Sequence, residues 1–274
     1  MNKIILVGVG RMGAAMLQGW IESLGQGFSF VGIDPHPAID KAILIKQAAD
    51  NPHVDFHSSI EDMPDSGPAA AIVLATKPQH IAKALVDVAT FIDVNTLVIS
   101  VAAGVTLGTL KQNCPPGQPV IRAMPNIGAM VGKSATAACA SEDVDQEGRN
   151  LAEMLFNAIG RLTWLVDESD LHTVTAVSGS GPAYFFAMCE AMITAAVTAG
   201  LPIEISTALV LDTISASGRL LDETPDPAKL RETVTSPNGT TAAGLAALSK
   251  NAKLNSMVAE AIKAARQRST ELSG

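Results

Sequence analysis

A turn rich in hydroxyl groups, TVTSPNGTTAAGL, is the first place in this sequence where side chains could do chemistry. Its polar and turn-forming residues include Ser236, Asn238, Gly239, Thr240 and Thr241. An apolar, helix-like run follows, and the first amides of a helix have no partners within it. Amides and hydroxyls together could therefore hold an anion such as a carboxylate. The same residue types are also common as ordinary helix caps, so both interpretations stay open at this point.

A glycine-rich segment near the N-terminus, ILVGVGRMGAAM, is the second such place. Gly8, Gly10 and Gly13 follow a strand-like run and open a helix-like one, which is the arrangement that lets a backbone approach a pyrophosphate. Asp34 ends the next strand-like run, where a carboxylate can bind ribose hydroxyls. The segment predicts a dinucleotide site, and Asp34 favours NADH because its charge would repel the extra phosphate of NADPH. A simple turn before Pro35 is the alternative role for Asp34.

The elements that must position these residues alternate along the first part of the chain. Short apolar runs are typical of strands buried on both faces: KIILVGV, FSFVGID, AAAIVLAT, TLVISVAA, PVIRAM and RLTWLV. Amphipathic stretches such as RMGAAMLQGWIESLG separate them. This alternation predicts an α/β fold with a doubly wound, mostly parallel sheet, a Rossmann-type dinucleotide-binding domain over residues 1–166.

Strand-like runs stop after that point, which predicts an all-helical second domain over residues 167–274. PAYFFAMCEAMITAAVTAG is apolar or small nearly all round, as in a helix buried on every side. Either a single bundle core or the helices of a second subunit would bury it, and we expect the second subunit.

Composition and motif absences exclude several classes of protein. The net charge of −8 argues against nucleic acid, and no apolar run approaches the roughly 20 residues needed to span a bilayer. Three cysteines without a C-x-x-C pair and five histidines without H-E-x-x-H predict no metal site. Sparse cysteine and an N-terminus without a cleavage site predict a cytoplasmic protein.

The proton donors of common carbonyl reductases are missing. The only tyrosine, Tyr184, has Met188 four residues later in place of the lysine of short-chain dehydrogenases. A second G-x-G, at Gly179 and Gly181, follows no strand and is not expected to bind phosphate. A C=N bond can be protonated before hydride arrives, so its reduction needs mainly orientation and a dry pocket. A site of hydroxyls and amides suits an imine.

Taken together, the segments resemble the pyrroline-5-carboxylate reductase family over essentially the whole chain. The resemblance rests on GVGRMG, LATKPQ, SVAAGV, RAMPN, VTAVSGSGPAYFF and LRETVTSPNGTTAAGL in this order. It implies reduction of 1-pyrroline-5-carboxylate to L-proline with NADPH or NADH, the last step of proline biosynthesis. The habit of the family favours NADPH, whereas Asp34 favours NADH. The resemblance also implies a homodimer with interlocked helical domains, with a higher oligomer of dimers left open.

The resemblance further implies roles for individual residues. The cofactor would be bound by Gly8, Gly10, Arg11, Met12, Gly13, Asp34, Ser59, Ala75, Thr76, Lys77, Pro78 and Ala102. Thr241 would hydrogen-bond the ring nitrogen, and Ser236 and Thr240 would serve the substrate carboxylate or shape the loop. Further substrate contacts would come from Asn238, Gly239, Ser178 and Glu223. The alternatives are a simple N-cap for Thr241, close helix packing at Gly179 and Gly181 for the segment of Ser178, and a solvated helix end for Glu223. No side chain needs to act as a strong acid, because the iminium brings its own proton.

Three departures from the family pattern concern preference and leave the reacting groups in place. DPHP stands where many members carry Asn-Arg-Thr, and Ile127-Gly128 follows RAMPN where Thr-Pro is frequent. Asn238-Gly239 replaces the usual double glycine, and asparagine tolerates left-handed backbone, so we expect the turn to keep its shape. The alternatives are a related imine or 3-hydroxyacid oxidoreductase of this architecture, or a cofactor-binding regulator without turnover.

Overall fold

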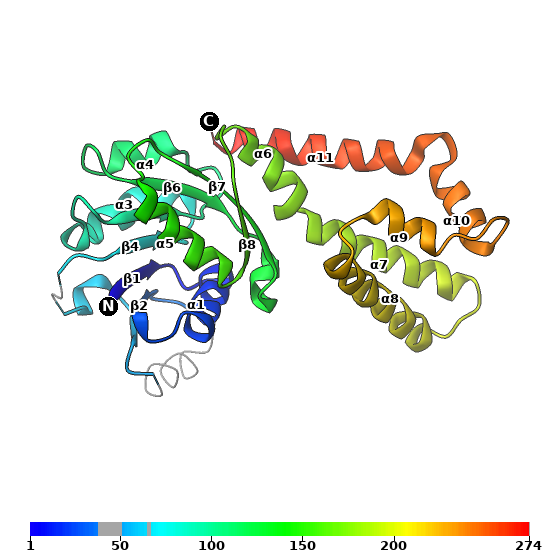
Figure 1. Cartoon of the computed structure of the whole chain (residues 1–274), viewed down its shortest axis with the longest axis horizontal. Helices are drawn as coiled ribbons and strands as arrows, with labels where there is room; N and C mark the ends of the chain where they lie inside the picture. Colours follow the sequence, from blue (N-terminus) through cyan, green and yellow to red (C-terminus); the bar gives the residue numbers. More distant parts are fainter. Residues whose placement is uncertain (38–50, 65–66, 274) are drawn as a thin grey trace. The chain divides into compact units, whose positions relative to one another are not determined.

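The computed structural model describes residues 1–37, 51–64 and 67–273. The chain forms two compact units (Figure 1): unit 1 comprises Met1–Gly179 with Ala265–Gly274, and unit 2 comprises Ser180–Ala264. The strands do end before the predicted boundary at residue 166, but the polypeptide enters unit 2 later and returns to unit 1 at its end. The assignment of cofactor binding to 1–166 and of substrate binding and dimerisation to 167–274 stays a prediction.

Unit 1 is built on a sheet that has eight strands among the described residues, in the order β3-β2-β1-β4-β5-β6-β7-β8. The strands are β1 (Asn2–Val7), β2 (Phe28–Ile33), β3 (Val54–His57), β4 (Ala71–Leu74), β5 (Leu97–Ser100), β6 (Val120–Met124), β7 (Ser134–Ala140) and β8 (Gly160–Trp164). Neighbouring strands are parallel except β6 and β7, which are antiparallel. The predicted doubly wound, mostly parallel sheet is confirmed.

Helices cover both faces of this sheet. They are α1 (Arg11–Ser23), α3 (Ile81–Asp87), α4 (Leu107–Asn113), α5 (Gln146–Asn157) and the short α6 (Asp170–Val174). Buried side chains of α1 and α5 pack on one face, and those of α3 and α4 pack on the other. Trp20 of α1 is fully buried and its indole N–H donates to the carbonyl of Leu155 in α5, 2.8 Å away, which joins the two helices on their shared face.

Strand β7 is an element that the sequence analysis missed. Its sequence, SATAACA, is dominated by alanine, which has low strand propensity, so no β-branched run reveals it. It forms because β6 and β8 supply hydrogen bonds on both of its edges. Its partner β8 lies where the sequence predicts a strand.

Short helical turns complete unit 1. The 3₁₀ turns are η1 (Gly25–Gly27), η2 (Ile60–Asp62), η3 (Pro78–His80), η4 (Ala89–Phe91) and η5 (Ile127–Val131). Residues Thr175–Gly179 form one π-helical turn, η6. Gly179 ends this turn and Gly181 begins the helix that follows, so the second G-x-G is not a phosphate-binding loop after a strand.

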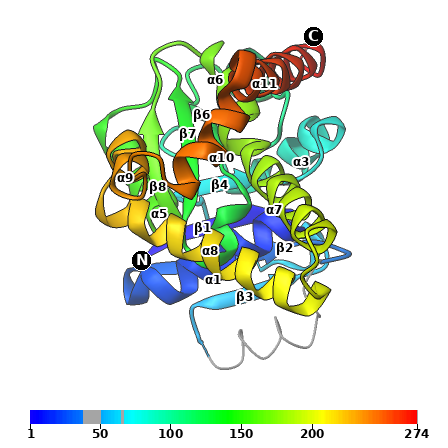
Figure 2. The same cartoon turned by 90° about the vertical axis from the view of Figure 1, so that its right-hand side faces the viewer.

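Unit 2 is helical and described throughout. Its elements are α7 (Gly181–Thr198), α8 (Ile203–Glu223), α9 (Pro227–Thr233), α10 (Thr240–Ser249) and η7 (Lys250–Ala252), and most of α11 (Lys253–Glu271) follows. Figure 2 shows α7 and α8, which pack against each other and are joined by a short connection.

The apolar side chains of α7 and α8 are largely exposed in the single chain. Phe185 is 62% exposed and Phe186 63%, whereas the buried hydrophobic side chains of this fully described unit are Cys189 and Val210. The alternative of a single bundle core is therefore wrong, because one chain leaves the helix surface open to solvent. Along the described part of the chain, no helix is long and apolar enough to cross a membrane.

Candidate functional site

The cofactor residues predicted from the sequence gather at one edge of the sheet. Gly8 follows β1, Asp34 follows β2, Ser59 lies just beyond β3, Ala75 follows β4 and Ala102 lies just beyond β5. These five strands are parallel, so their carboxyl ends meet at the same edge. β1 lies between β2 and β4, where the strand order reverses direction, and open α/β sheets bind ligands at such a point.

The glycine loop has the geometry that a pyrophosphate requires. Gly8 has a φ of 97°, and a Cβ on it would lie 2.8 Å from the backbone of Ala75. A Cβ on Gly13 would lie 2.0 Å from the carbonyl oxygen of Gly8, so α1 can approach β1 only through these glycines. Beside Gly10, by contrast, the space is open, and this residue starts α1 without a side-chain cap. The first amides of α1 thus face a gap that suits a phosphate.

Asp34 is held in place by the glycine loop. One carboxylate oxygen accepts the amide of Val9 at 2.7 Å, and the other accepts the amide of His36 at 2.7 Å. Each oxygen keeps a second lone pair that could accept a ribose hydroxyl. The hydroxyl of Ser59 donates to Asp62 at 2.9 Å, so it already has a partner.

The loop after β4 contains an orphaned polar atom. The Oγ1 of Thr76 is buried and has no hydrogen-bond partner among the described residues. Buried hydroxyls are normally satisfied, so a polar group of a bound molecule would complete this one. Lys77 and Pro78 are exposed beside it, while Ala102 is buried and donates its amide to Ser100. Together with the open space at Gly10, these residues fit a dinucleotide.

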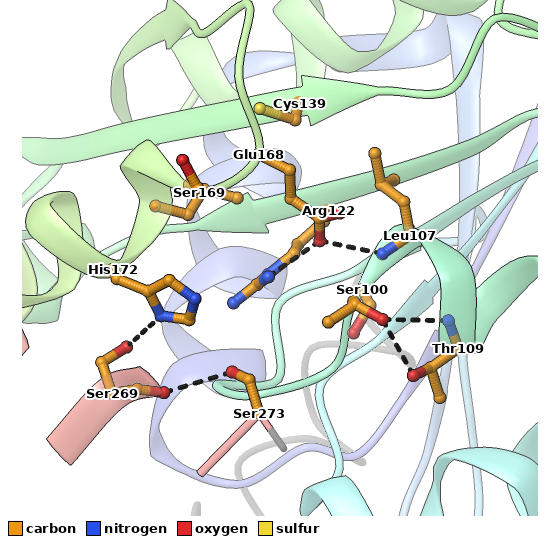
Figure 3. Close-up of polar contacts among 12 residues, drawn as sticks. Ser100, Leu107, Thr109, Arg122, Cys139, Glu168, Ser169, His172, Ser269 and Ser273 are labelled. Atoms are coloured by element: carbon orange, nitrogen blue, oxygen red, sulfur yellow. Dashed lines mark hydrogen bonds and ion pairs between the residues drawn. The ribbon is translucent and has the colours of Figure 1, made fainter. Parts of the chain in front are cut away.

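A partly buried ion pair between Arg122 and Glu168 lies beside the start of α4 (Figure 3). Glu168 accepts from Arg122 Nη1 at 2.8 Å and from the amide of Leu107, the first residue of α4, at 2.9 Å. Arg122 is only 4% exposed, so loss of its carboxylate partner would leave a buried charge uncompensated. The carboxylate of Glu168, which lies outside the sheet, thus holds both Arg122 of β6 and the first residue of α4.

The last turn of α11 lies against the same part of unit 1. His172 Nδ1 and Ser269 Oγ are 3.0 Å apart, as Figure 3 shows, and a Cβ on Gly104 would lie 2.5 Å from the carbonyl oxygen of Leu272. Burial, helped by the charge of Arg122, lowers the pKa of His172 below its usual value. The sequence analysis missed this contact, since nothing in a helical repeat says where its end will dock.

The thiols of Cys114 and Cys139 are not reactive groups. Burial, with a smaller contribution from the charge of Glu168, raises the pKa of Cys139 to about 11, and burial raises that of Cys114 to about 11. Both remain protonated near neutral pH, and thiols are poor nucleophiles in that form. Among the described residues, no group of three or more His, Cys, Asp or Glu side chains could hold a metal ion.

Ser178, predicted to contact the substrate, lies in the π-helical turn of unit 1. Its hydroxyl donates to the carbonyl of Val174 at 3.1 Å, and its own carbonyl accepts from the side chain of Asn126 at 2.9 Å. Asn126 is the last residue of the RAMPN segment, and no role was predicted for it. Single-turn π-helices often mark functional sites.

In unit 2 the hydroxyl-rich turn precedes α10 and leaves the start of that helix uncapped. Asn238 has a φ of 59°, the left-handed conformation expected of it, and Gly239 is the capping residue. No side chain accepts a hydrogen bond there, so Thr240 and Thr241 are the first helical residues and not caps. The helix-cap interpretation of Thr241 is therefore wrong.

The turn also brings a hydroxyl to the free amides. The amide of Gly239 donates to the carbonyl of Ser236 at 3.1 Å, and a Cβ on Gly239 would lie 2.3 Å from Ser236 Oγ. The side chains of Ser236, Thr240 and Thr241 are exposed. Glu223 ends α8 and is exposed, and within the described parts of the chain no hydrogen bond or ion pair joins it to the turn.

Comparisons with known proteins agree with this arrangement. Residues 168–272 match the family model for pyrroline-5-carboxylate reductase dimerisation. A pyrroline-5-carboxylate reductase of Pseudomonas aeruginosa is 34% identical over 98% of this chain and 96% of its own. The chain belongs to the pyrroline-5-carboxylate reductase family. The resemblance stated from the sequence is confirmed.

Solved structures of pyrroline-5-carboxylate reductases share the fold. The one from Coxiella burnetii is 30% identical with a TM-score of 0.89, covering 100% of this chain and 99% of its own. The one from Plasmodium falciparum, solved with NADP bound, is 28% identical with a TM-score of 0.79, covering 100% and 98%. The dimerisation match also agrees with the open apolar surface of α7 and α8, which a second copy of the chain would cover.

Proposed function

We propose that this chain reduces 1-pyrroline-5-carboxylate to L-proline as a homodimer. The observation that carries the proposal is the uncapped start of α10, with its left-handed turn at Asn238 and the hydroxyls of Ser236 and Thr241 beside it. Free helix amides and the positive end of the helix dipole stabilise a carboxylate, and the substrate carries one.

The chain's own groups act by binding and orientation. The hydroxyls of Ser236 and Thr240 and the first amides of α10 would hold the substrate carboxylate, and the hydroxyl of Thr241 would accept or donate a hydrogen bond at the ring nitrogen. Bound along the sheet edge from Gly8 to Ala102, NADH or NADPH would supply the hydride for the C=N carbon. Fixing the ring in one orientation removes most of the entropic cost of this step.

Asp34 supports NADH as the preferred cofactor. Its carboxylate is fixed by two backbone amides, so it cannot swing away from the ribose position without losing both hydrogen bonds. A fixed negative charge would repel the 2′-phosphate of NADPH. The interlocked arrangement of helices, any assembly beyond a dimer and a cytoplasmic location are further parts of the proposal, the last supported by three free thiols.

The test is the rate of nicotinamide oxidation by purified protein with 1-pyrroline-5-carboxylate and either cofactor. We expect turnover with both, faster with NADH. Thr241→Ala should lower kcat about tenfold to hundredfold, the range for one oriented hydrogen bond, and leave cofactor affinity unchanged. Thr241→Ser should keep most of the rate, and Thr163→Ala, an exposed strand threonine in unit 1, is the matched control. No turnover by the wild-type protein would overturn the proposed function.

A further inference from the structure

The carbonyl of Ser178 has lost the partner that a helix would give it. In an α-helix this oxygen would accept from the amide of residue 182, but Pro182 has no N–H. The next amide along, that of Ala183, donates to the carbonyl of Ser180. Asn126 replaces the missing donor, because its Nδ2 lies 2.9 Å from the Ser178 oxygen.

The orientation of the Asn126 side-chain amide is fixed by its oxygen, Oδ1. Oδ1 accepts two backbone amides, those of Gly128 at 3.1 Å and Ala135 at 3.2 Å. A flipped amide would point its NH₂ group at two donors, so the flip is excluded. The backbone amide of Asn126 also donates to Ser134 Oγ at 3.1 Å. Nδ2 is thus directed at the turn by a rigid frame of η5 and β7.

The turn itself has few other polar ties to the sheet, although Ala176 within it is fully buried. A Cβ on Gly179 would lie 3.3 Å from the end of Met124, a tight approach but one to the flexible end of a side chain. The hydroxyls of Thr175 and Ser178 donate to carbonyls one helical turn earlier, those of Leu171 and Val174 in α6. The bond from Asn126 is therefore the polar link that sets the turn against β6 among the hydrogen bonds described.

We propose that Asn126 is a positioning residue for the imine reduction, holding residues 175–179 where Ser178 meets the substrate ring. This inference rests on the proposed function, in which that segment contacts the substrate. The location favours it, because β6 ends at Met124 beside β5, whose loop carries Ala102. A displacement of about 1 Å between reacting groups can cost roughly a hundredfold in rate.

The Asn126→Asp variant separates the hydrogen bond to Ser178 from the other hydrogen bonds of Asn126. The substitution keeps an oxygen for the amides of Gly128 and Ala135, removes the donor to Ser178 and sets an oxygen against its carbonyl. We expect kcat to fall about tenfold to hundredfold, while Kd for NADH changes less than about threefold. Asn157→Asp is the matched control: Asn157 Oδ1 accepts from the amide of Leu162, and the same isosteric change keeps that acceptor.

The pH dependence of kcat in Asn126→Asp is a measurement that a purely structural role of Asn126 would not change. The introduced carboxyl would be half-buried against a carbonyl oxygen, which favours its protonated form, while the amides of Gly128 and Ala135 favour its charged form. Once protonated, its O–H can donate to Ser178 in place of the lost N–H. The ratio of variant to wild-type kcat should therefore rise as the pH falls through the pKa of this carboxyl.

A second variant covers the case in which Asn126→Asp fails to fold. Asn126→Ser is uncharged, keeps an acceptor near Gly128 and cannot reach Ser178, so kcat should fall without any recovery in acid. Wild-type kcat in either variant, or a loss of kcat in Asn157→Asp as large as that in Asn126→Asp, would overturn the inference. Failure of the wild-type protein to reduce 1-pyrroline-5-carboxylate would instead reject the proposed function itself.

Discussion

Replacing Asp34 by serine should shift the cofactor preference from NADH towards NADPH. The wild-type carboxylate accepts the amides of Val9 and His36, and in the proposed cofactor site its charge would face the ribose. Serine removes that charge and can accept at most one of the two amides. The change therefore lowers repulsion of a 2′-phosphate and also removes an acceptor for the 2′-hydroxyl of NADH.

The size of the shift follows from Coulomb's law. Two unit charges about 5 Å apart interact by roughly 1 kcal/mol in a water-like medium and roughly 3 kcal/mol at a protein surface of lower dielectric. The phosphate carries about one to two charges, so the relief ranges from about 1.5 kcal/mol, for two charges in the water-like medium, to about 3 kcal/mol, for one charge at the lower dielectric. Since 1.4 kcal/mol corresponds to a factor of ten, the NADPH-to-NADH ratio of kcat/KM should rise about tenfold to hundredfold.

Steady-state rates with each cofactor at low and high salt measure this ratio. Asp55→Ser, which removes an exposed carboxylate from the neighbouring strand β3, is the control and should leave the ratio unchanged. Added salt screens charge, so the wild-type preference should weaken with ionic strength more than that of Asp34→Ser. An unchanged ratio in Asp34→Ser would refute the assignment of cofactor choice to this carboxylate.

Three further predictions concern other parts of the structure. Gly13→Ala should destabilise the protein by about 3 kcal/mol and abolish cofactor binding, because its Cβ would lie 2.0 Å from the Gly8 oxygen. A Cβ on Gly27 would have no atom within 4 Å, so Gly27→Ala is the control and should change neither Tm nor the Kd of the cofactor. Burial lowers the pKa of His172, so the unfolded state takes up the proton first as pH falls below about 6.5, and stability is lost. His172→Asn, which cannot titrate, should show a shallower fall in urea midpoint, and equal slopes would contradict this. Phe186→Asp should raise the dimer dissociation constant at least tenfold in sedimentation experiments, since this exposed ring would lie in the interface.

The sequence predicted the elements whose signals are local. The glycine loop was recognisable because its glycines avoid short-range steric clashes. The parallel strands were recognisable because burial on both faces requires continuous apolar runs. The left-handed backbone at Asn238 was also predictable, since few residue types tolerate that conformation.

The features that were missed depend on partners far away in the sequence. β7 is alanine-rich and exists through its two neighbours, and the single-bundle alternative failed because a helix surface does not reveal which chain covers it. The pair of Arg122 with Glu168, 46 residues apart, and that of Asn126 with Ser178, 52 apart, leave no periodic signal. Such contacts follow only once the sheet has set the distances.

The return of α11 to unit 1 makes unit 2 an insertion within unit 1. A premature stop codon or a trimmed C-terminus that removed residues from Ser269 onward would strip the cover from Gly104 and the partner from His172. Loss of these last residues would thus disturb the packing beside the loop of Ala102, and not that of the helices that immediately precede them in sequence. Affinity tags and fusion partners are better attached at the N-terminus, where Met1 is 71% exposed.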